Sequence, residues 1–181
     1  MGWVLAAALW GFAEATLFFI VPDVLLTWIA GFRPERAGPA LGACLIGALL
    51  GGALMFSLAA RDPQGTSQLV ERVPAVSVQL LDRTGAAFDD DYGAQMLRGG
   101  LSGVPYKVMA VEASIHDGSV FRFLAWSLPA RLPRWIALMV LARGVAGFVR
   151  RRSARADRWL NGLWLAAWCT VYAVYFSVMD G

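Results

Sequence analysis

The sequence predicts an all-α integral membrane protein in which residues 1–181 form a single membrane domain. The apolar share of 58% and the low charged share of 16% separate it from soluble domains, in which about a quarter of the residues are charged. Long apolar runs recur along the chain, and prolines next to charged residues divide several of them. We therefore expect two re-entrant helical hairpins together with about three to four transmembrane helices.

The first predicted hairpin lies near the start of the chain. Residues 3–20 are apolar apart from the charge of Glu14, and residues 24–32 are apolar again after Pro22 and Asp23. A helix of the second run rises only about 13 Å, less than half of a hydrocarbon core of about 30 Å, so it is predicted to be re-entrant or broken. Because Glu14 interrupts the first run, this run differs from a cleaved signal sequence, and we expect it to remain in the mature protein.

The clearest predicted span is residues 40–60, which contain no charged residue and are long enough to cross a membrane. Gly47 and Gly51 lie four positions apart in this run. Small residues at this spacing allow two helix backbones to approach closely. The sequence therefore predicts tight packing of this span against a neighbouring helix.

A polar connecting segment, residues 61–98, follows the clearest span. Its apolar residues recur at roughly helical spacing, which predicts an amphipathic helix at the membrane surface. The segment also contains three consecutive aspartates, Asp89, Asp90 and Asp91. Because successive residues of a helix point in different directions, we interpret this run as a solvated loop or a helix start and not as a cation site.

The second predicted hairpin combines residues 101–113, which contain Pro105 and Lys107, with residues 120–128, which end before Pro129. Each run is too short to cross a membrane by itself. Two broken apolar segments in the two halves of a membrane chain are typical of a binding site near the middle of the bilayer. The second hairpin is thus expected to meet the first at such a site.

Two further spans are predicted at residues 132–149 and 159–179. The basic cluster between them consists of Arg150, Arg151, Arg152, Arg155 and Arg158. Basic residues beside membrane spans favour the cytoplasmic side, so we expect the loop of residues 150–158 in the cytoplasm. Anionic lipid headgroups are nearer partners for such a cluster than a nucleic acid, and no nucleic-acid partner is expected.

Five charged residues fall in or beside runs that are expected to enter the membrane. They are the acids Glu14 and Asp23 and the bases Lys107, Arg131 and Arg134. A charged side chain at the centre of a bilayer costs about 2.5–3.5 kcal/mol, which a partner or a ligand must offset. The break at Pro22 allows both acids to face one side, and two arginines three positions apart share a helix face. We predict one cavity that binds an anionic headgroup and exchanges protons.

The sequence gives little support for an enzyme. Cys44 and Cys169 each lie inside an apolar run and are interpreted as small buried residues. The single histidine, His116, is interpreted as an interfacial turn residue between two apolar runs. Residues 100–103 match the G-x-S-G pattern of rhomboid-type intramembrane proteases, but no histidine follows His116 to activate the serine. We expect no catalytic residue, no metal and no cofactor.

Short motifs in a fixed order occur at residues 12–26 (FAEATLFFIVPDVLL), 33–37 (RPERA), 103–108 (GVPYKV) and 127–134 (SLPARLPR). This set resembles the DedA superfamily, also described by its VTT or SNARE-associated domain, and in particular the short YqaA-like branch. The resemblance implies two re-entrant hairpins that meet in the membrane. It also implies movement of lipids between leaflets, including carrier lipids such as undecaprenyl phosphate in bacteria. The functional positions that it implies are Glu14, Asp23, Lys107, Arg131 and Arg134.

The leading hypothesis is a multi-pass protein of the bacterial inner (plasma) membrane that translocates or scrambles anionic lipids. The lipid is either a phospholipid or a polyprenyl-phosphate carrier lipid, and protons are coupled through Glu14 or Asp23. The expected partners are membrane lipids and protons, and homo-oligomer formation is left open. The alternative is a non-transporting membrane scaffold for envelope assembly, in which the buried charges only pair with one another.

Overall fold

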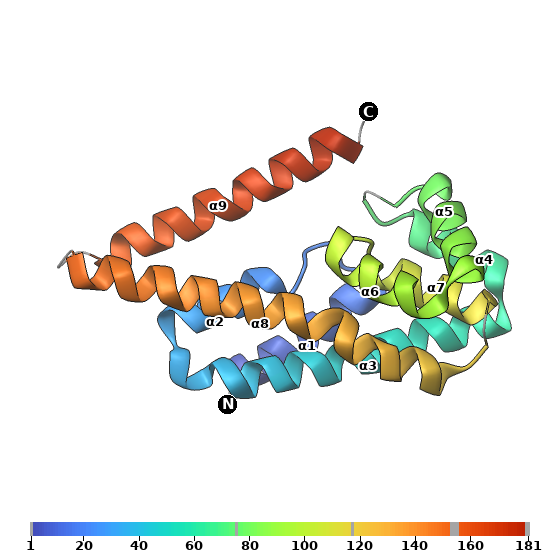
Figure 1. Cartoon of the computed structure of the whole chain (residues 1–181), viewed down its shortest axis with the longest axis horizontal. Coiled ribbons are helices and arrows are strands. Elements are labelled where there is room, and N and C mark those ends of the chain that lie inside the picture. Colours follow the sequence, from blue (N-terminus) through green and yellow to red (C-terminus); the bar gives the residue numbers. More distant parts are fainter. Residues whose placement is uncertain (1, 75, 117, 153–155, 180–181) are drawn as a thin grey trace.

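The computed structural model describes residues 2–74, 76–116, 118–152 and 156–179, and these residues form nine α-helices and no strand (Figure 1). The helices are α1 (Gly2–Thr16), α2 (Asp23–Phe32), α3 (Ala37–Arg61), α4 (Pro63–Glu71), α5 (Val78–Asp90), α6 (Tyr92–Ser102), α7 (Tyr106–His116), α8 (Val120–Arg152) and α9 (Ala156–Met179), with a 3-10 turn, η1 (Pro34–Arg36), before α3. The all-α prediction is confirmed for the described residues. Two stretches of the described residues are long and apolar enough to cross a membrane. One is η1 together with α3, and the other is α8.

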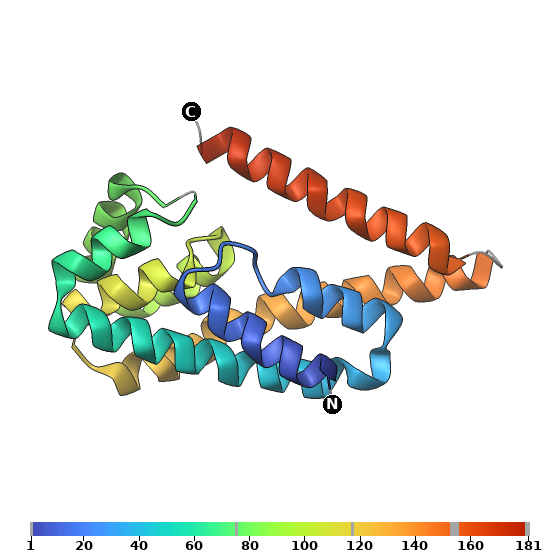
Figure 2. The ribbon, with the colours of Figure 1, turned by 180° about the vertical axis from the view of Figure 1, so that it is seen from behind.

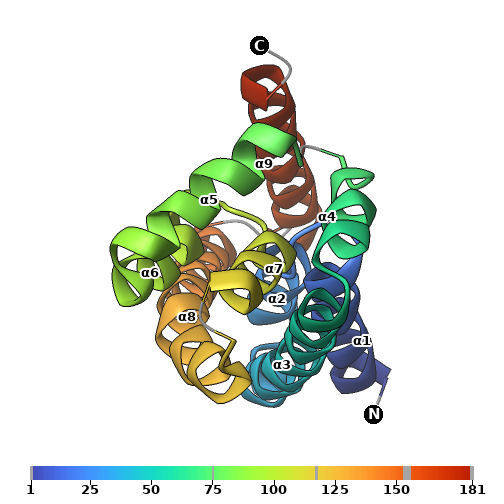
Figure 3. The same cartoon turned by 90° about the vertical axis from the view of Figure 1, so that its right-hand side faces the viewer.

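The central helix of the bundle is α7. Figure 3 shows α3, α4, α5, α6 and α8 arranged around it, and its residues from 106 to 114 are all buried. With 11 residues, α7 is about 16 Å long. It therefore fills the centre of the bundle without being long enough to cross a membrane.

The first predicted break is present between α1 and α2, where residues 17–22 form no helix (Figure 2). Pro22 directly precedes α2, and a proline can begin a helix but cannot continue one from the preceding turn. The apolar run reaches residue 20, yet α1 already ends at Thr16. Trp10 stabilises the break, because its indole N–H donates to the carbonyl oxygen of Ile20 at 3.0 Å.

The most extensive helix pair is α1 with α3, and we refer to it as the α1–α3 seam. A Cβ atom added to Gly47 would overlap the carbonyl oxygen of Ala8. A Cβ added to Gly51 would lie 2.8 Å from the carbonyl oxygen of Phe12. Since only glycine leaves room for this approach, the predicted tight packing at Gly47 and Gly51 is confirmed.

The polar connecting segment forms the three short helices α4, α5 and α6, and not the single amphipathic helix that the spacing predicted. Side chains at each helix start explain the division, because each accepts a hydrogen bond from a free backbone N–H group. Asp62 caps α4, Ser77 caps α5 and Asp91 caps α6. For Asp91, the predicted helix start is confirmed.

The sequence predicts a break between residues 128 and 132, but the structure has a single 33-residue helix there, α8. The predicted short run 120–128 is the first part of this helix, and the predicted span 132–149 is its second part. Pro129 and Pro133 lie within it, where each removes one backbone hydrogen bond. Membrane helices tolerate such prolines when neighbouring groups stabilise the freed carbonyls. The second hairpin is therefore wrong as predicted, whereas the break at Pro105 is present between α6 and α7.

At the other end of the chain, α9 stands apart from the bundle (Figures 1 and 2). It contacts α8 and α2, and Leu160 packs against Ala146 of α8 in a small apolar cluster. The predicted last span, residues 159–179, lies within its 24 residues. The prediction is correct for the helix, and its crossing of a membrane stays a prediction.

The predicted basic cluster lies at the connection between α8 and α9. Arg150, Arg151 and Arg152 end α8, and Arg158 lies in the first turn of α9. Arg155 lies outside the described residues. Arg150 donates from Nε to Oδ1 of Asp157 at 3.1 Å, which joins the two helix ends.

Candidate functional site

A cavity of about 330 Å³ lies where the two chain breaks meet α8 and α9. Its lining includes all five predicted residues, which are Glu14, Asp23, Lys107, Arg131 and Arg134. Four different helices supply these side chains: α1, α2, α7 and α8. The structure therefore brings the predicted residues together although more than 100 positions of sequence separate some of them.

The second chain break positions Lys107 at this cavity. Gly103 ends α6 with a φ of +88°, a left-handed conformation that glycine adopts without steric cost. Pro105 follows and supplies a carbonyl that accepts from the N–H of Met109 at 3.2 Å. Lys107 thus lies in the first turn of α7, directly after the break, and lines the cavity.

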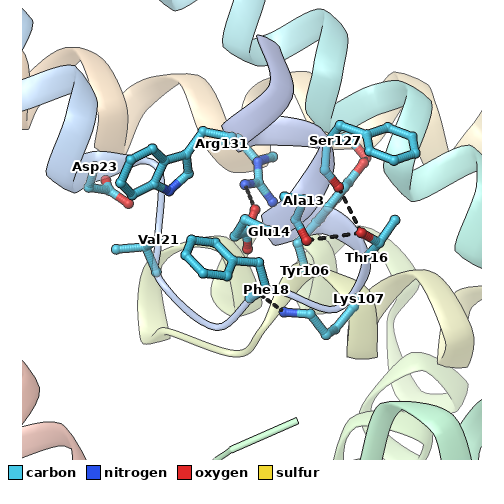
Figure 4. A network of polar contacts seen from close by, with 12 residues as sticks. Ala13, Glu14, Thr16, Phe18, Val21, Asp23, Tyr106, Lys107, Ser127 and Arg131 are labelled. Atoms are coloured by element: carbon cyan, nitrogen blue, oxygen red, sulfur yellow. Dashed lines mark hydrogen bonds and ion pairs between the residues drawn. The ribbon is translucent and has the colours of Figure 1, made fainter. Parts of the chain in front are cut away.

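Glu14 and Arg131 form the deeper ion pair. Nη2 of Arg131 donates to Oε2 of Glu14 at 2.5 Å, and both side chains are only 6% exposed. The guanidinium carbon of Arg131 lies 4.1 Å from the ring centre of Tyr106 and 4.7 Å from that of Trp135. The Tyr106 hydroxyl donates to Ser127 Oγ at 2.7 Å. Two rings and one carboxylate therefore surround the guanidinium group, and Figure 4 shows Arg131 pointing toward Glu14.

Asp23 and Arg134 form a second pair nearer the cavity opening. Nη2 of Arg134 donates to Oδ2 of Asp23 at 3.0 Å. The side chain of Asp23 is 2% exposed, whereas that of Arg134 is 27% exposed. Within the described residues, Oδ1 of Asp23 and Nε of Arg134 have no hydrogen-bond partner. The pair therefore keeps one acceptor and one donor for a further group.

Lys107 is arranged differently from the two arginines. Its side chain is buried, and its ammonium donates to the carbonyl oxygen of Phe18 at 3.2 Å (Figure 4). Phe18 belongs to the non-helical residues of the first break. The bond therefore joins the two chain breaks to each other at the cavity.

One side of the cavity consists of residues that the sequence analysis did not select. We define the aromatic wall as Trp168, Val171, Tyr172 and Tyr175 of α9. The hydroxyl of Tyr172 accepts from the backbone N–H of Val21 at 2.8 Å, and the indole N–H of Trp168 donates to Thr27 Oγ1 at 3.1 Å. Aromatic residues recur every four positions at 164, 168 and 172. Because residues four positions apart share a helix face, this spacing could have indicated the wall from the sequence.

Chemically, the cavity combines a charged floor with an apolar and aromatic side. Most of the binding sites that accept organic molecules are apolar with a few fixed polar groups. Here those groups are two ion pairs and an ammonium, which can hold an anionic oxygen through charge-assisted hydrogen bonds. The arrangement fits a ligand that has a charged end and an apolar end.

Two interpretations of other residues need correction. Cys44 is buried as expected, but Cys169 is exposed, because α9 stands away from the bundle. His116 is the last residue of α7 and not a turn residue, and its Nδ1 lies 2.6 Å from Oδ1 of Asp89. Among the described residues, no group of three or more histidine, cysteine, aspartate or glutamate side chains could hold a metal ion.

Comparisons with protein-family models, with curated proteins and with solved structures found no match. The resemblance to the DedA superfamily therefore stays a prediction.

Proposed function

We propose that the chain is a multi-pass membrane protein that translocates anionic lipids between the two leaflets. The observation that carries this proposal is that two ion pairs and a lysine line the same cavity as the aromatic wall of α9. Charged groups in such a cavity bind a phosphate headgroup, while the aromatic wall accepts an apolar chain. The proposed activity makes and breaks no covalent bond.

In the proposed membrane arrangement, α3 and α8 cross the bilayer and α9 crosses beside α8. The two chain breaks are the tips of re-entrant hairpins, the first formed by α1 and α2 and the second by α6 and α7, in place of the second hairpin that the sequence predicted. Residues of both breaks line the cavity, which supports this, because non-helical backbone at membrane depth is tolerated where it lines a cavity. The arginines at the connection between α8 and α9 face the cytoplasm in this proposal. The bacterial inner membrane and a carrier lipid as substrate derive from the family resemblance.

In the proposed transport cycle, protonation of Glu14 or Asp23 releases the paired arginine. Arg131 is held by Glu14 and Arg134 by Asp23. A proton on either acid removes the charge that attracts its arginine. The freed guanidinium then binds the headgroup, and deprotonation re-forms the ion pair after the lipid leaves.

A second candidate function is a membrane scaffold that moves no lipid. Both ion pairs are formed in the structure, so each arginine already has a carboxylate partner. This favours the scaffold. In that case the charges connect α1 and α2 to α8 and have no ligand. The two candidates differ in what happens when the pairs are altered without loss of folding.

The first test is the movement of a fluorescent phospholipid and of a polyprenyl phosphate between leaflets of proteoliposomes. The informative variant replaces both members of the deeper pair, Glu14→Gln with Arg131→Met, because removing both charges avoids an unpaired buried ion. Arg143→Gln is the matched control, since Arg143 is an exposed residue of the same helix. We expect movement with the wild type and the control and its loss in the double variant. No movement by folded wild-type protein would favour the scaffold.

The second test is Asp23→Glu, which keeps the charge but shifts the carboxylate by one methylene group. A transporter needs the carboxylate at a fixed distance from Arg134 and the headgroup, so we expect impaired lipid movement with nearly unchanged thermal stability. A scaffold needs only a charge partner. Unchanged lipid movement in Asp23→Glu would contradict a direct role of this residue in the transport step.

A further inference from the structure

Lys107 differs from the other charged residues of the cavity because it has no charged partner. Arg131 is paired with Glu14, and Arg134 is paired with Asp23. Within the residues that the structure describes, Lys107 donates only to a backbone carbonyl. With all of these groups ionised, the two pairs cancel, and one positive charge remains in the cavity.

The surroundings of Lys107 leave its charge available to a ligand. An ammonium group carries three donors, and one of them is used by the carbonyl oxygen of Phe18. The residue lines the cavity together with Phe19 and Val21 of the first break and Val104 of the second. Two donors of the ammonium group therefore remain for a ligand in the cavity.

A buried ammonium without a counter-charge favours one class of ligand. An ion that is removed from water and left unpaired is unfavourable by several kcal/mol, and a bound anion offsets this. A headgroup with one net negative charge makes the cavity neutral. A zwitterionic headgroup has no net charge and introduces a second ammonium, so it leaves the positive charge uncompensated and adds repulsion.

We propose that Lys107 selects lipids whose headgroup carries a single net negative charge, such as a phosphodiester without an amine, over zwitterionic lipids. Lys107 makes the first contact with a phosphate oxygen, while Arg131 and Arg134 are still paired. The apolar chains lie along the aromatic wall. This inference rests on the proposed lipid movement and specifies the substrate class of that same cavity.

The test measures movement of phosphatidylglycerol and phosphatidylcholine with identical acyl chains in proteoliposomes. We expect the wild type to move phosphatidylglycerol about tenfold faster, the ratio that corresponds to one hydrogen bond to a charged group. In Lys107→Gln the two rates should become nearly equal, mainly through slower movement of phosphatidylglycerol. Arg143→Gln removes an exposed charge from α8 outside the cavity, and the wild-type ratio should persist in it.

The outcomes separate the inference from the function on which it rests. Equal rates for the two lipids with wild-type protein would overturn the inference, and this comparison needs no variant to fold. A full preference for phosphatidylglycerol in folded Lys107→Gln would also overturn it, while lipid movement itself would stand. If folded wild-type protein moves neither lipid, the proposed function fails together with the inference.

Discussion

The α1–α3 seam and the contact surface of α9 are packed in opposite ways. In the seam, backbone touches backbone, and there is no room for a single methyl group at Gly47. On α9, an added Cβ at Gly162 has nothing within 4 Å, and the helix is connected to α2 and the first break through tryptophan and tyrosine side chains. The difference indicates that close backbone packing holds the seam, whereas side-chain contacts hold α9.

The cavity lies between these two kinds of packing. Its charged floor is supplied by helices of the bundle, and its aromatic wall is supplied by α9. The hydrogen bonds of the wall to Val21 and Thr27 do not include the side chains of the two ion pairs.

The largest effect is expected for Arg131→Leu. It leaves Glu14 buried without a counter-charge, which should lower the free energy of unfolding by about 3–5 kcal/mol. Denaturant or thermal unfolding in detergent measures this. Arg143→Leu, at an exposed position of the same helix, should change stability by less than about 0.5 kcal/mol. Equal effects of the two variants would show that the pair of Glu14 and Arg131 does not contribute to the free energy of unfolding.

Gly47→Ala should destabilise the seam by about 1–3 kcal/mol, because the new methyl group overlaps the backbone of α1. Gly42→Ala is the matched control on the same helix, with nothing within 4 Å of the added Cβ. It should be neutral or stabilising by up to about 1 kcal/mol, as expected for alanine in place of glycine within a helix. Opposite signs in the same unfolding assay support the seam, and a neutral Gly47→Ala would argue against it.

Tyr172→Phe removes the hydroxyl that accepts from the N–H of Val21. We expect a loss of about 1 kcal/mol, together with faster hydrogen exchange of the Val21 amide. Tyr175→Phe serves as the control, because the Tyr175 hydroxyl makes no hydrogen bond within the described residues. If the Val21 amide exchanges equally slowly in both variants, the contact does not hold α9 to the first break.

The smallest effect is expected for Gly162→Ala on α9. The open space around this position predicts a stabilisation of less than about 1 kcal/mol, opposite in sign to Gly47→Ala. The same unfolding assay measures both. A clear destabilisation would mean that α9 packs tightly against another surface, such as a second copy of the chain, and the contrast with the seam would then fail.

Some of this architecture could be predicted from the sequence because its causes are local. Pro22 and Pro105 have no backbone donor and restrict the residue before them, which favours a break directly before α2 and α7. The charges of Glu14, Asp23 and Lys107 require compensation in any apolar run. Gly47 and Gly51 leave room for a neighbour on one helix face. Each of these signals depends on a short stretch of chain.

Other features could not be predicted because they depend on distant partners. Pro129 and Pro133 do not interrupt α8, since the surrounding helices decide whether the lost hydrogen bonds are tolerated. The aromatic wall becomes part of the cavity only through contacts such as that between Val21 and Tyr172, which are 151 positions apart. Neither outcome can be recognised from the residues next to these positions.

Photocrosslinking tests most directly whether lipids occupy the cavity. The probe is phosphatidylglycerol with a diazirine on its acyl chain, incorporated with the wild-type protein into liposomes, and mass spectrometry identifies the modified residues. We expect adducts on the aromatic wall, at Trp168, Val171, Tyr172 and Tyr175. We also expect that an excess of unlabelled phosphatidylglycerol, but not of phosphatidylcholine, suppresses them. Adducts confined to outward-facing residues such as Val140 and Leu141, which are exposed on α8, would contradict lipid binding in the cavity.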